Sequence, residues 1–264
     1  METEKDFGLN EHKCGKMRFF VFKKKTLIAI ILCVVVCAVC IGGGIGIAAT
    51  AADKPAVRPL IVVDPGHGGI DYGVTGQGGT KESEFNLEMS RTLAELLEGA
   101  GFSVVMTRTD ENGLYGDADD NFKKADMAAR KKIIQDSAPD LVISIHANKF
   151  PGEDRRGAQV FFDGFNEEGM SLANFIQSGL NSLNTQYVGR TYSALKGDYF
   201  ILKCSLAPSV IVECGFLSNA EDEKLLNDAE YRKKLAFAVY SGAVGYLTES
   251  EAFSLGEEVT GTDC

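Results

Sequence analysis

The chain has 264 residues, of which 45% are hydrophobic and 24% are charged, as expected for one globular domain with an additional segment. Seven of the 27 basic and four of the 37 acidic residues lie in residues 1–52, so the remainder has 20 basic and 33 acidic residues and a net charge of −13. Such an acidic domain disfavours nucleic acid and adhesion to anionic lipid, because both require a basic surface.

The first predicted element is an apolar helix that follows a basic leader, residues 1–26. Residues 27–47 are 21 positions without a charge. At about 1.5 Å per residue this run is long enough for the roughly 30 Å hydrocarbon core of a bilayer. We therefore predict a transmembrane or signal-anchor helix over residues 27–50. Because basic flanks remain in the cytoplasm, the C-terminal bulk is expected outside the cell membrane.

Cleavage of this leader is an alternative. The small residues 48–52 resemble a signal-peptidase site, and their use would release the protein. The apolar run is longer than a usual signal core, which favours an uncleaved anchor.

Beyond a linker, residues 51–59, apolar β-branched runs alternate with segments of helical periodicity. The strand-like segments are Leu60–Val63, Ser103–Thr107, Leu141–Ile145, Ala158–Phe162 and Ser209–Glu213. The helix-like segments are Glu82–Gly99, Phe122–Ser137, Glu167–Leu183 and Tyr231–Leu247. This alternation predicts a single α/β domain over residues 60–248, with a largely parallel twisted sheet and helices on both faces. Residues 249–264 are expected to be a disordered polar tail.

Only two histidines lie beyond the leader, and each directly follows one of the apolar runs. His67 belongs to the glycine-rich segment DPGHGG, and His146 follows Leu141–Ile145. If these runs are parallel strands, both imidazoles emerge at the carboxyl edge of the sheet, where open α/β sheets bind ligands. A phosphate-binding loop is a weaker interpretation of the glycines, because neither GxxxxGK[ST] nor GxGxxG is present.

Two imidazoles near carboxylates indicate a catalytic zinc ion, which takes three protein ligands and leaves one position open. Without a third histidine in the domain, the remaining ligand should be acidic. Glu82 is our choice because it follows the Gly76–Gly79 loop and begins a predicted helix. Glu84 is a rival that points elsewhere on the helix, and a first-turn carboxylate favoured by the helix dipole is the structural alternative.

Glu213 is the second acidic candidate, because it ends an apolar and therefore buried strand. A carboxylate with a purely structural role is the alternative. In a zinc site it would be the general base that takes a proton from water. Burial should raise its pKa, and the charge of a metal should oppose that rise.

The cysteines do not form a disulfide framework. Three lie in the globular part, Cys204, Cys214 and Cys264, and no CxxC pair occurs there. Cys214 is interpreted as a small buried residue rather than a thiol nucleophile, because no further histidine is available to activate it.

Several segments together resemble the zinc-dependent N-acetylmuramoyl-L-alanine amidases of the amidase-3 family. They are IVVDPGHGG, GGTKESEFNL, DLVISIHAN, RGAQVFF and IVECGFLSN, and they occur in the family's order over residues 60–247. The resemblance implies a six-stranded α/β domain with one zinc ion held by His67, Glu82 and His146, and with Glu213 as the catalytic residue. It also implies hydrolysis of the amide between the muramic acid lactyl group and L-alanine of the peptidoglycan stem peptide.

Within the family, the membrane leader, the lone catalytic domain and the segment Gly197–Lys203 resemble the spore-cortex branch of germination-specific amidases. A vegetative cell-separation amidase and a non-catalytic, membrane-tethered scaffold remain alternatives. The expected partners are peptidoglycan stem peptides, the membrane through the N-terminal helix, and a helper protein. No nucleic acid is expected.

Overall fold

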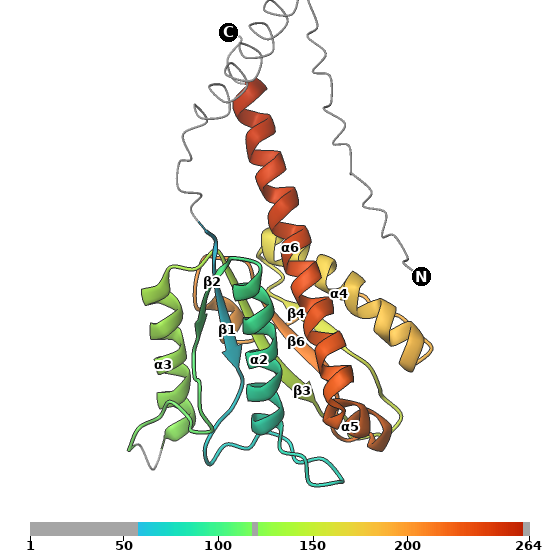
Figure 1. Cartoon of the computed structure of the whole chain (residues 1–264). Helices are drawn as coiled ribbons and strands as arrows, with labels where there is room; N and C mark the ends of the chain where they lie inside the picture. Colours follow the sequence, from blue (N-terminus) through green and yellow to red (C-terminus); the bar gives the residue numbers. More distant parts are fainter. Residues whose placement is uncertain (1–57, 118–120, 261–264) are drawn as a thin grey trace, which may run out of the picture. The chain divides into compact units, whose positions relative to one another are not determined.

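The computed structural model describes residues 58–117 and 121–260, with side chains described up to residue 250 (Figure 1). The chain divides between Ala56 and Val57 into two units, and the described residues belong to the second. The predicted leader, the span over residues 27–50 and most of the linker therefore lie outside the described residues. Among the helices that are described, none is both long and apolar enough to cross a bilayer.

Six strands form one sheet in the order β2-β1-β3-β6-β4-β5. Neighbours are parallel throughout, except that β4 runs antiparallel to β6. The bounds are β1 Leu60–Pro65, β2 Ser103–Met106, β3 Leu141–Asn148, β4 Gln159–Phe162, β5 Leu195–Lys196 and β6 Ser209–Phe216. The predicted α/β domain with a largely parallel sheet of about six strands is confirmed.

Helices cover both faces of this sheet. The helices and the 3-10 helix η1 are α2 Glu82–Gly99, α3 Phe122–Ser137, α4 Glu167–Tyr187, η1 Ile201–Lys203, α5 Ala220–Asn227 and α6 Ala229–Thr260. Successive strand residues point to opposite faces. Accordingly, Ile61 and Val63 of β1 join the core beneath α2, α4 and α6, whereas Val62 joins a second core with α3 and η1. In Figure 1, α2 and α6 lie in front of the sheet and α3 at its left edge.

Three elements differ from the sequence-based expectation. Strand β5 has two residues and α5 has eight, so neither is long enough to show a periodic hydrophobic pattern in the sequence. The Asn219 side chain caps α5 by accepting hydrogen bonds from two backbone amides. Helix α6 continues to Thr260, so the expectation of a disordered tail over residues 249–264 is wrong for residues 249–260. That stretch contains helix-favouring Glu, Ala and Leu and no proline that would end the helix.

The order of the strands creates a switch point between β1 and β3. From β1 the chain crosses to β2 on one side and later to β3 on the other, and the crevice at such a point is where open α/β sheets bind ligands. Strand β6 lies directly beside β3, with His146 opposite Glu213 in the register. The carboxyl ends of β1, β3 and β6 are therefore neighbours.

A buried ion pair lies beneath this edge. Asp64 ends the apolar part of β1, and its Oδ1 atom accepts a hydrogen bond from Nη1 of Arg130 at 2.6 Å. Thr107 donates to the same carboxylate oxygen at 2.6 Å, and Ser144 donates to the other at 2.6 Å. The carboxylate thus joins β1, β2 and β3 to helix α3.

We predict that Asp64 makes stability acid-sensitive. Burial would raise the pKa of Asp64, but the charge of Arg130 and hydrogen bonds from Ser144 and Thr107 outweigh it and lower the pKa from 3.8 to about 2. Since the folded pKa lies below the unfolded one, the stabilisation is present above about pH 4 and is lost as the pH falls toward 2. The shift corresponds to about 2 kcal/mol.

Urea unfolding, followed by tyrosine circular dichroism because the chain lacks tryptophan, measures this contribution. Asp64→Asn should cost on the order of 3 kcal/mol at neutral pH, because Arg130 is left buried without its partner. Between pH 5 and pH 2.5, the wild type should then lose about 2 kcal/mol more than the variant. Asp136→Asn, which removes an exposed carboxylate on α3, is the control. Equal acid sensitivity of wild type and Asp64→Asn would contradict the prediction.

Candidate metal centre

The loop after β1 brings His67 into the crevice through an unusual backbone conformation. His67 has a φ of +60°, in the left-handed region that non-glycine residues rarely occupy. The carbonyl oxygen of His67 accepts a hydrogen bond from Arg130 Nη2 at 2.6 Å. Arg108 donates to the carbonyls of Pro65 and Gly66 at 3.0 and 2.9 Å. Two buried guanidinium groups therefore fix three successive carbonyls of this loop.

Position 66 requires a glycine because the His146 ring packs against its backbone. A Cβ atom at position 66 would lie 2.2 Å from the His146 ring, far inside van der Waals contact. His146 itself extends from β3, in the last part of that strand. The absence of a side chain at Gly66 thus lets the second imidazole approach the loop that carries the first.

Glu82 begins α2 and turns back over the same crevice. Its Oε2 atom accepts a hydrogen bond from the Val74 amide at 2.8 Å, and its Oε1 atom accepts one from the Ala147 amide at 3.3 Å. Gly73 has a φ of +66°, and a Cβ atom there would lie 2.3 Å from Glu82 Oε2. The rival Glu84 is exposed and pairs with Lys81 at 2.8 Å.

The loop that leads into Glu82 is anchored on helix α5. The Glu223 carboxylate accepts hydrogen bonds from the amides of Gly78 and Thr80 at 2.8 and 3.2 Å. Asn227 donates to the Thr80 hydroxyl at 2.7 Å. Helix α5, which the sequence did not predict, thus supports the segment from which Glu82 emerges.

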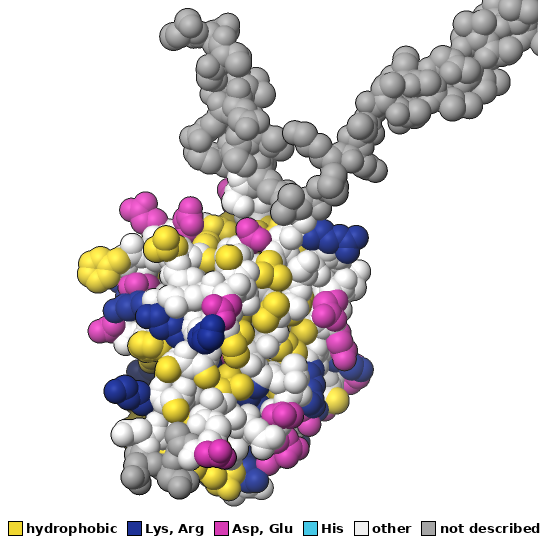
Figure 2. Space-filling view, turned by 90° about the vertical axis from the view of Figure 1, so that its left-hand side faces the viewer, with side chains coloured by type: hydrophobic (Ala, Val, Ile, Leu, Met, Phe, Trp, Pro, Cys, Tyr) yellow, Lys and Arg dark blue, Asp and Glu magenta, His cyan; other side chains and the backbone are white. Residues whose placement is uncertain are grey.

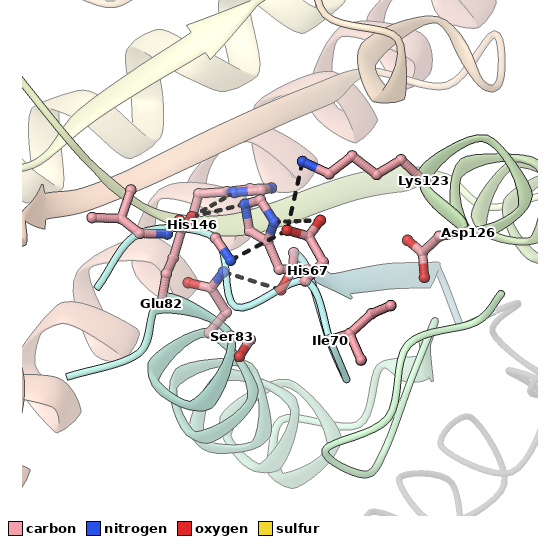
Figure 3. A network of polar contacts seen from close by, with 12 residues as sticks. His67, Ile70, Glu82, Ser83, Lys123, Asp126 and His146 are labelled. Atoms are coloured by element: carbon pink, nitrogen blue, oxygen red, sulfur yellow. Dashed lines mark hydrogen bonds and ion pairs between the residues drawn. The ribbon is translucent and has the colours of Figure 1, made fainter. Parts of the chain in front are cut away.

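His67, Glu82 and His146 converge on one point. Glu82 Oε1 lies 3.3 Å from His67 Nε2 and 2.9 Å from His146 Nδ1. The two rings are nearly perpendicular, with centroids 5.1 Å apart. One ligand atom from each of the three residues lies within 4.8 Å of the others. Figure 3 shows the three side chains pointing toward one another.

Asp71 orients His67 from the other side of the ring. Its Oδ2 atom lies 3.0 Å from His67 Nδ1, and its Oδ1 atom accepts a hydrogen bond from the Gly73 amide at 3.3 Å. Lys123 Nζ lies 3.8 Å from the same carboxylate. With Nδ1 engaged in this way, Nε2 of His67 is the nitrogen that faces Glu82, as in carboxylate–histidine–metal arrangements.

The electrostatics of this cluster favour a cation. Burial would lower the pKa of His67, but the carboxylates of Glu82 and Asp71 outweigh it and raise the pKa to about 9. Burial would raise the pKa of Glu82, but hydrogen bonds and the charges of His146 and His67 outweigh it and hold the pKa well below its usual range. Positive charge between these groups is therefore stabilised, and a divalent ion held by the same donor atoms would supply it.

Glu213 lies beside the cluster, opposite His146 in the β3–β6 register. Its Oε2 atom is inaccessible to solvent and has no hydrogen-bond partner among the described residues. Burial raises the pKa of Glu213 to about 7, and the charge of Glu82 adds to this rise while the two imidazoles oppose it. A carboxyl group that titrates near neutral pH can both accept and donate a proton under physiological conditions.

The structure thus brings together all four residues that the sequence proposed as a site. Sequence reasoning missed Asp71, Arg108 and Arg130. Asp71 follows His67 by four residues in a predicted loop, and this spacing only weakly indicates a contact between them. For Arg108 and Arg130, no pattern in the sequence indicated a role at the site. Cys204 and Cys214 are buried, and burial raises the pKa of the Cys214 thiol far above its usual range, which agrees with the interpretation of Cys214 as a small buried residue.

Comparison with known proteins identifies the family to which this domain is similar. Residues 61–244 match the amidase-3 family, described as N-acetylmuramoyl-L-alanine amidase. The germination-specific N-acetylmuramoyl-L-alanine amidase of Bacillus subtilis (strain 168) is 33% identical over 198 residues, which cover 74% of this chain and 82% of that protein. The N-acetylmuramoyl-L-alanine amidase LytC of the same organism is 32% identical, and the match covers 73% of this chain and 36% of LytC.

Among solved structures, the CwlD amidase from Clostridioides difficile, in complex with the GerS lipoprotein, has a TM-score of 0.68 and 34% sequence identity. The match covers 72% of this chain and 99% of that chain. An N-acetylmuramoyl-L-alanine amidase from Clostridium difficile 630 has a TM-score of 0.64 and 26% identity, over 72% of this chain and 97% of that chain.

We predict that Asp71→Asn weakens divalent-metal binding about 10- to 100-fold, because a neutral amide no longer fixes the His67 ring as a carboxylate does. Competition with a chromophoric zinc chelator measures the affinity. Asp198→Asn removes a carboxylate that is almost fully exposed and should leave the affinity unchanged. If Asp71→Asn binds zinc as tightly as the wild type, Asp71 does not orient the ligand.

Proposed function

The chain belongs to the amidase-3 family of N-acetylmuramoyl-L-alanine amidases, and on this premise we propose that its activity depends on zinc held by His67, Glu82 and His146, with Glu213 as the catalytic residue. It acts on peptidoglycan and hydrolyses the amide between the muramic acid lactyl group and L-alanine. The observation that carries the zinc proposal is the convergence of three ligand atoms within 4.8 Å of one another.

The donor set fits zinc better than the harder cations. Calcium and magnesium prefer sites made of oxygen ligands, whereas two imidazoles and one carboxylate are typical of catalytic zinc. When bound at such a site, zinc polarises the substrate carbonyl and makes water more acidic. The glycines at positions 66 and 73 let the ligands approach closely, so that little rearrangement of the protein is needed for binding.

Glu213 supplies the proton transfer in this proposal. It accepts a proton from the attacking water and passes it to the alanine nitrogen as the amide bond breaks. The unpartnered Oε2 atom supports this role, because a structural carboxylate at such a depth would be satisfied by hydrogen bonds.

The cellular setting is proposed from the leader and from the similar proteins. The domain would lie outside the cytoplasmic membrane, tethered by residues 27–50 or secreted if the leader is cleaved. We propose a role in maturation of the spore cortex, where removal of stem peptides would precede muramic lactam formation. The germination-specific name of the Bacillus subtilis relative supports this role. The similar CwlD amidase is in complex with the GerS lipoprotein, which supports a helper protein for this chain as well.

The reaction is tested by digesting purified peptidoglycan with the protein and identifying the new termini by mass spectrometry. New L-alanine amino termini on released stem peptides, lost on treatment with a chelator and restored by zinc, are the expected result. Cleavage at a different bond would contradict the substrate assignment. Activity unaffected by chelation would contradict the metal, and no cleavage with normal peptidoglycan binding would favour the scaffold alternative.

Variants separate the roles of the site residues. We expect Glu213→Ala to retain one zinc ion per chain but to lose about 10²- to 10⁴-fold in kcat, the usual contribution of a general acid–base. We expect His67→Ala to lose zinc, measured by elemental analysis of the dialysed protein. Glu84→Ala, at the exposed neighbour of Glu82, should retain both zinc and activity. Near-normal turnover by Glu213→Ala would exclude it as the base.

A further inference from the structure

A groove of about 410 Å³ lies between helix α3 and Phe200, on the face of the domain that α3 covers. Its walls combine an apolar floor with basic side chains: Lys124, Met127, Lys131 and Phe200. Phe200 is half exposed, and Lys131 Nζ lies 5.8 Å from the centroid of its ring. Figure 2 shows this side of the molecule, with Lys and Arg side chains beside hydrophobic ones. None of the described residues that line the groove is acidic.

Two of the three lysines that line this groove have no carboxylate partner. Within the described part of the chain, Lys124 and Lys131 are unpaired, whereas Lys132 pairs with Asp136. This occurs in a domain in which acidic residues outnumber basic ones. A concave site with two free ammonium groups and an exposed aromatic ring is suited to a ligand with carboxylates and apolar groups.

One wall of the groove begins at the metal centre. Lys123 precedes Lys124, and its ammonium group lies 3.8 Å from the Asp71 carboxylate that contacts His67. In Figure 3, the Lys123 side chain reaches toward the His67 and His146 rings. Helix α3 therefore leads from the site into the groove.

The opposite wall begins beside Glu213. Tyr199 precedes Phe200, and its ring packs edge-on against Phe161 of β4 at 5.6 Å. Strand β4 pairs with β6, where Gln159 lies opposite Glu213. Burial and the charge of Glu213 both raise the pKa of the Tyr199 hydroxyl, which places it within electrostatic reach of that carboxylate. Both walls of the groove thus follow directly along the chain from residues that lie near the site.

We propose that this groove binds the stem peptide of the substrate beyond the scissile amide, with Lys124 and Lys131 pairing with its free carboxylates and Phe200 packing on its apolar groups. This inference rests on the proposed function. A polymeric substrate extends past the bond that is cut, and helix α3 runs from Lys123 beside the site along one wall of the groove. A concave groove of about 410 Å³ suits a peptide better than a lipid surface, which is met by a broad basic patch.

The double variant Lys124→Gln/Lys131→Gln tests the charge contacts, using the full zinc-loaded chain and N-acetylmuramoyl-pentapeptide with free carboxylates. We expect KM to rise about three- to tenfold with kcat unchanged, the range expected for two exposed ion pairs. With the same muropeptide after amidation of its carboxylates, wild type and variant should have equal KM values. Lys233→Gln/Lys234→Gln on α6 makes the same change in net charge and should behave as the wild type.

Phe200→Ala tests the apolar contact. Its KM should rise on the free and on the amidated muropeptide alike, because packing does not depend on the carboxylates. The ring is half exposed, so the variant is expected to fold.

An unchanged KM in the double variant would overturn the inference, as would an equal rise in KM on the amidated muropeptide. The inference would also fail if the double variant lost binding to phosphatidylglycerol vesicles while its KM stayed the same, since the groove would then serve a lipid. Absence of any cleavage by the wild type would instead overturn the proposed function, and the groove assignment with it.

Discussion

The buried guanidinium group of Arg130 joins the fold to the site. Its Nη1 atom donates to the Asp64 carboxylate and to the carbonyl of Pro65, and its Nη2 atom donates to the carbonyl of His67. A buried charge is tolerated only when it is paired and its donors are satisfied. The groups that pair with Arg130 belong to β1 and to the loop that follows it. The same hydrogen bonds therefore satisfy the buried guanidinium group and hold His67 at a positive φ.

Arg108 completes this arrangement with a different set of partners. Its guanidinium group donates to backbone carbonyls, including that of Ser83 in the first turn of α2 at 2.8 Å. Because it lacks a carboxylate contact, burial lowers its pKa to about 10, and the nearby charge of Arg130 adds to this effect. Arg108 therefore links the loop after β1 to the helix that carries Glu82. Two ligands from separate elements are held at a fixed separation, which is the preorganisation that a metal site needs.

Sequence periodicity predicted much of the fold because the governing patterns are local. Helices α2 and α3 begin and end where their periodicity does, and the five strands of four or more residues were all found from their apolar runs. What could not be predicted depends on tertiary contacts. Strand β5 has two residues and exists only because β4 pairs with it. Strand β4 pairs antiparallel with β6, and an apolar run in the sequence does not show in which direction a strand will pair.

The residues of the site divide in the same way, into those that local patterns predict and those that depend on tertiary contacts. The two histidines and Glu213 could be found because each follows an apolar run, and Glu82 because it follows the glycine loop and begins a predicted helix. Arg130 shares one face of α3 with Asp126 and Ile134, and all three are buried. From the sequence, the Asp126–Arg130 pair would be assigned to a solvated helix face, because buried arginines are rare and the second carboxylate partner, Asp64, lies 66 residues away.

The position of β6 has a consequence for how the domain is assembled during folding. Strands β3 and β4 follow one another along the chain, yet β6, the last strand to be synthesised, lies between them. The segment from β4 to β5 can join the sheet only after β6 has inserted, and such non-local pairing slows folding. The histidines and Glu82 all belong to residues 67–146, which precede β6, but the loop that leads into Glu82 is held by Glu223 and Asn227 of α5, which follows β6. The arrangement of the candidate ligands therefore depends on a segment that is synthesised after β6, and the site is completed only when the C-terminal part of the domain has folded.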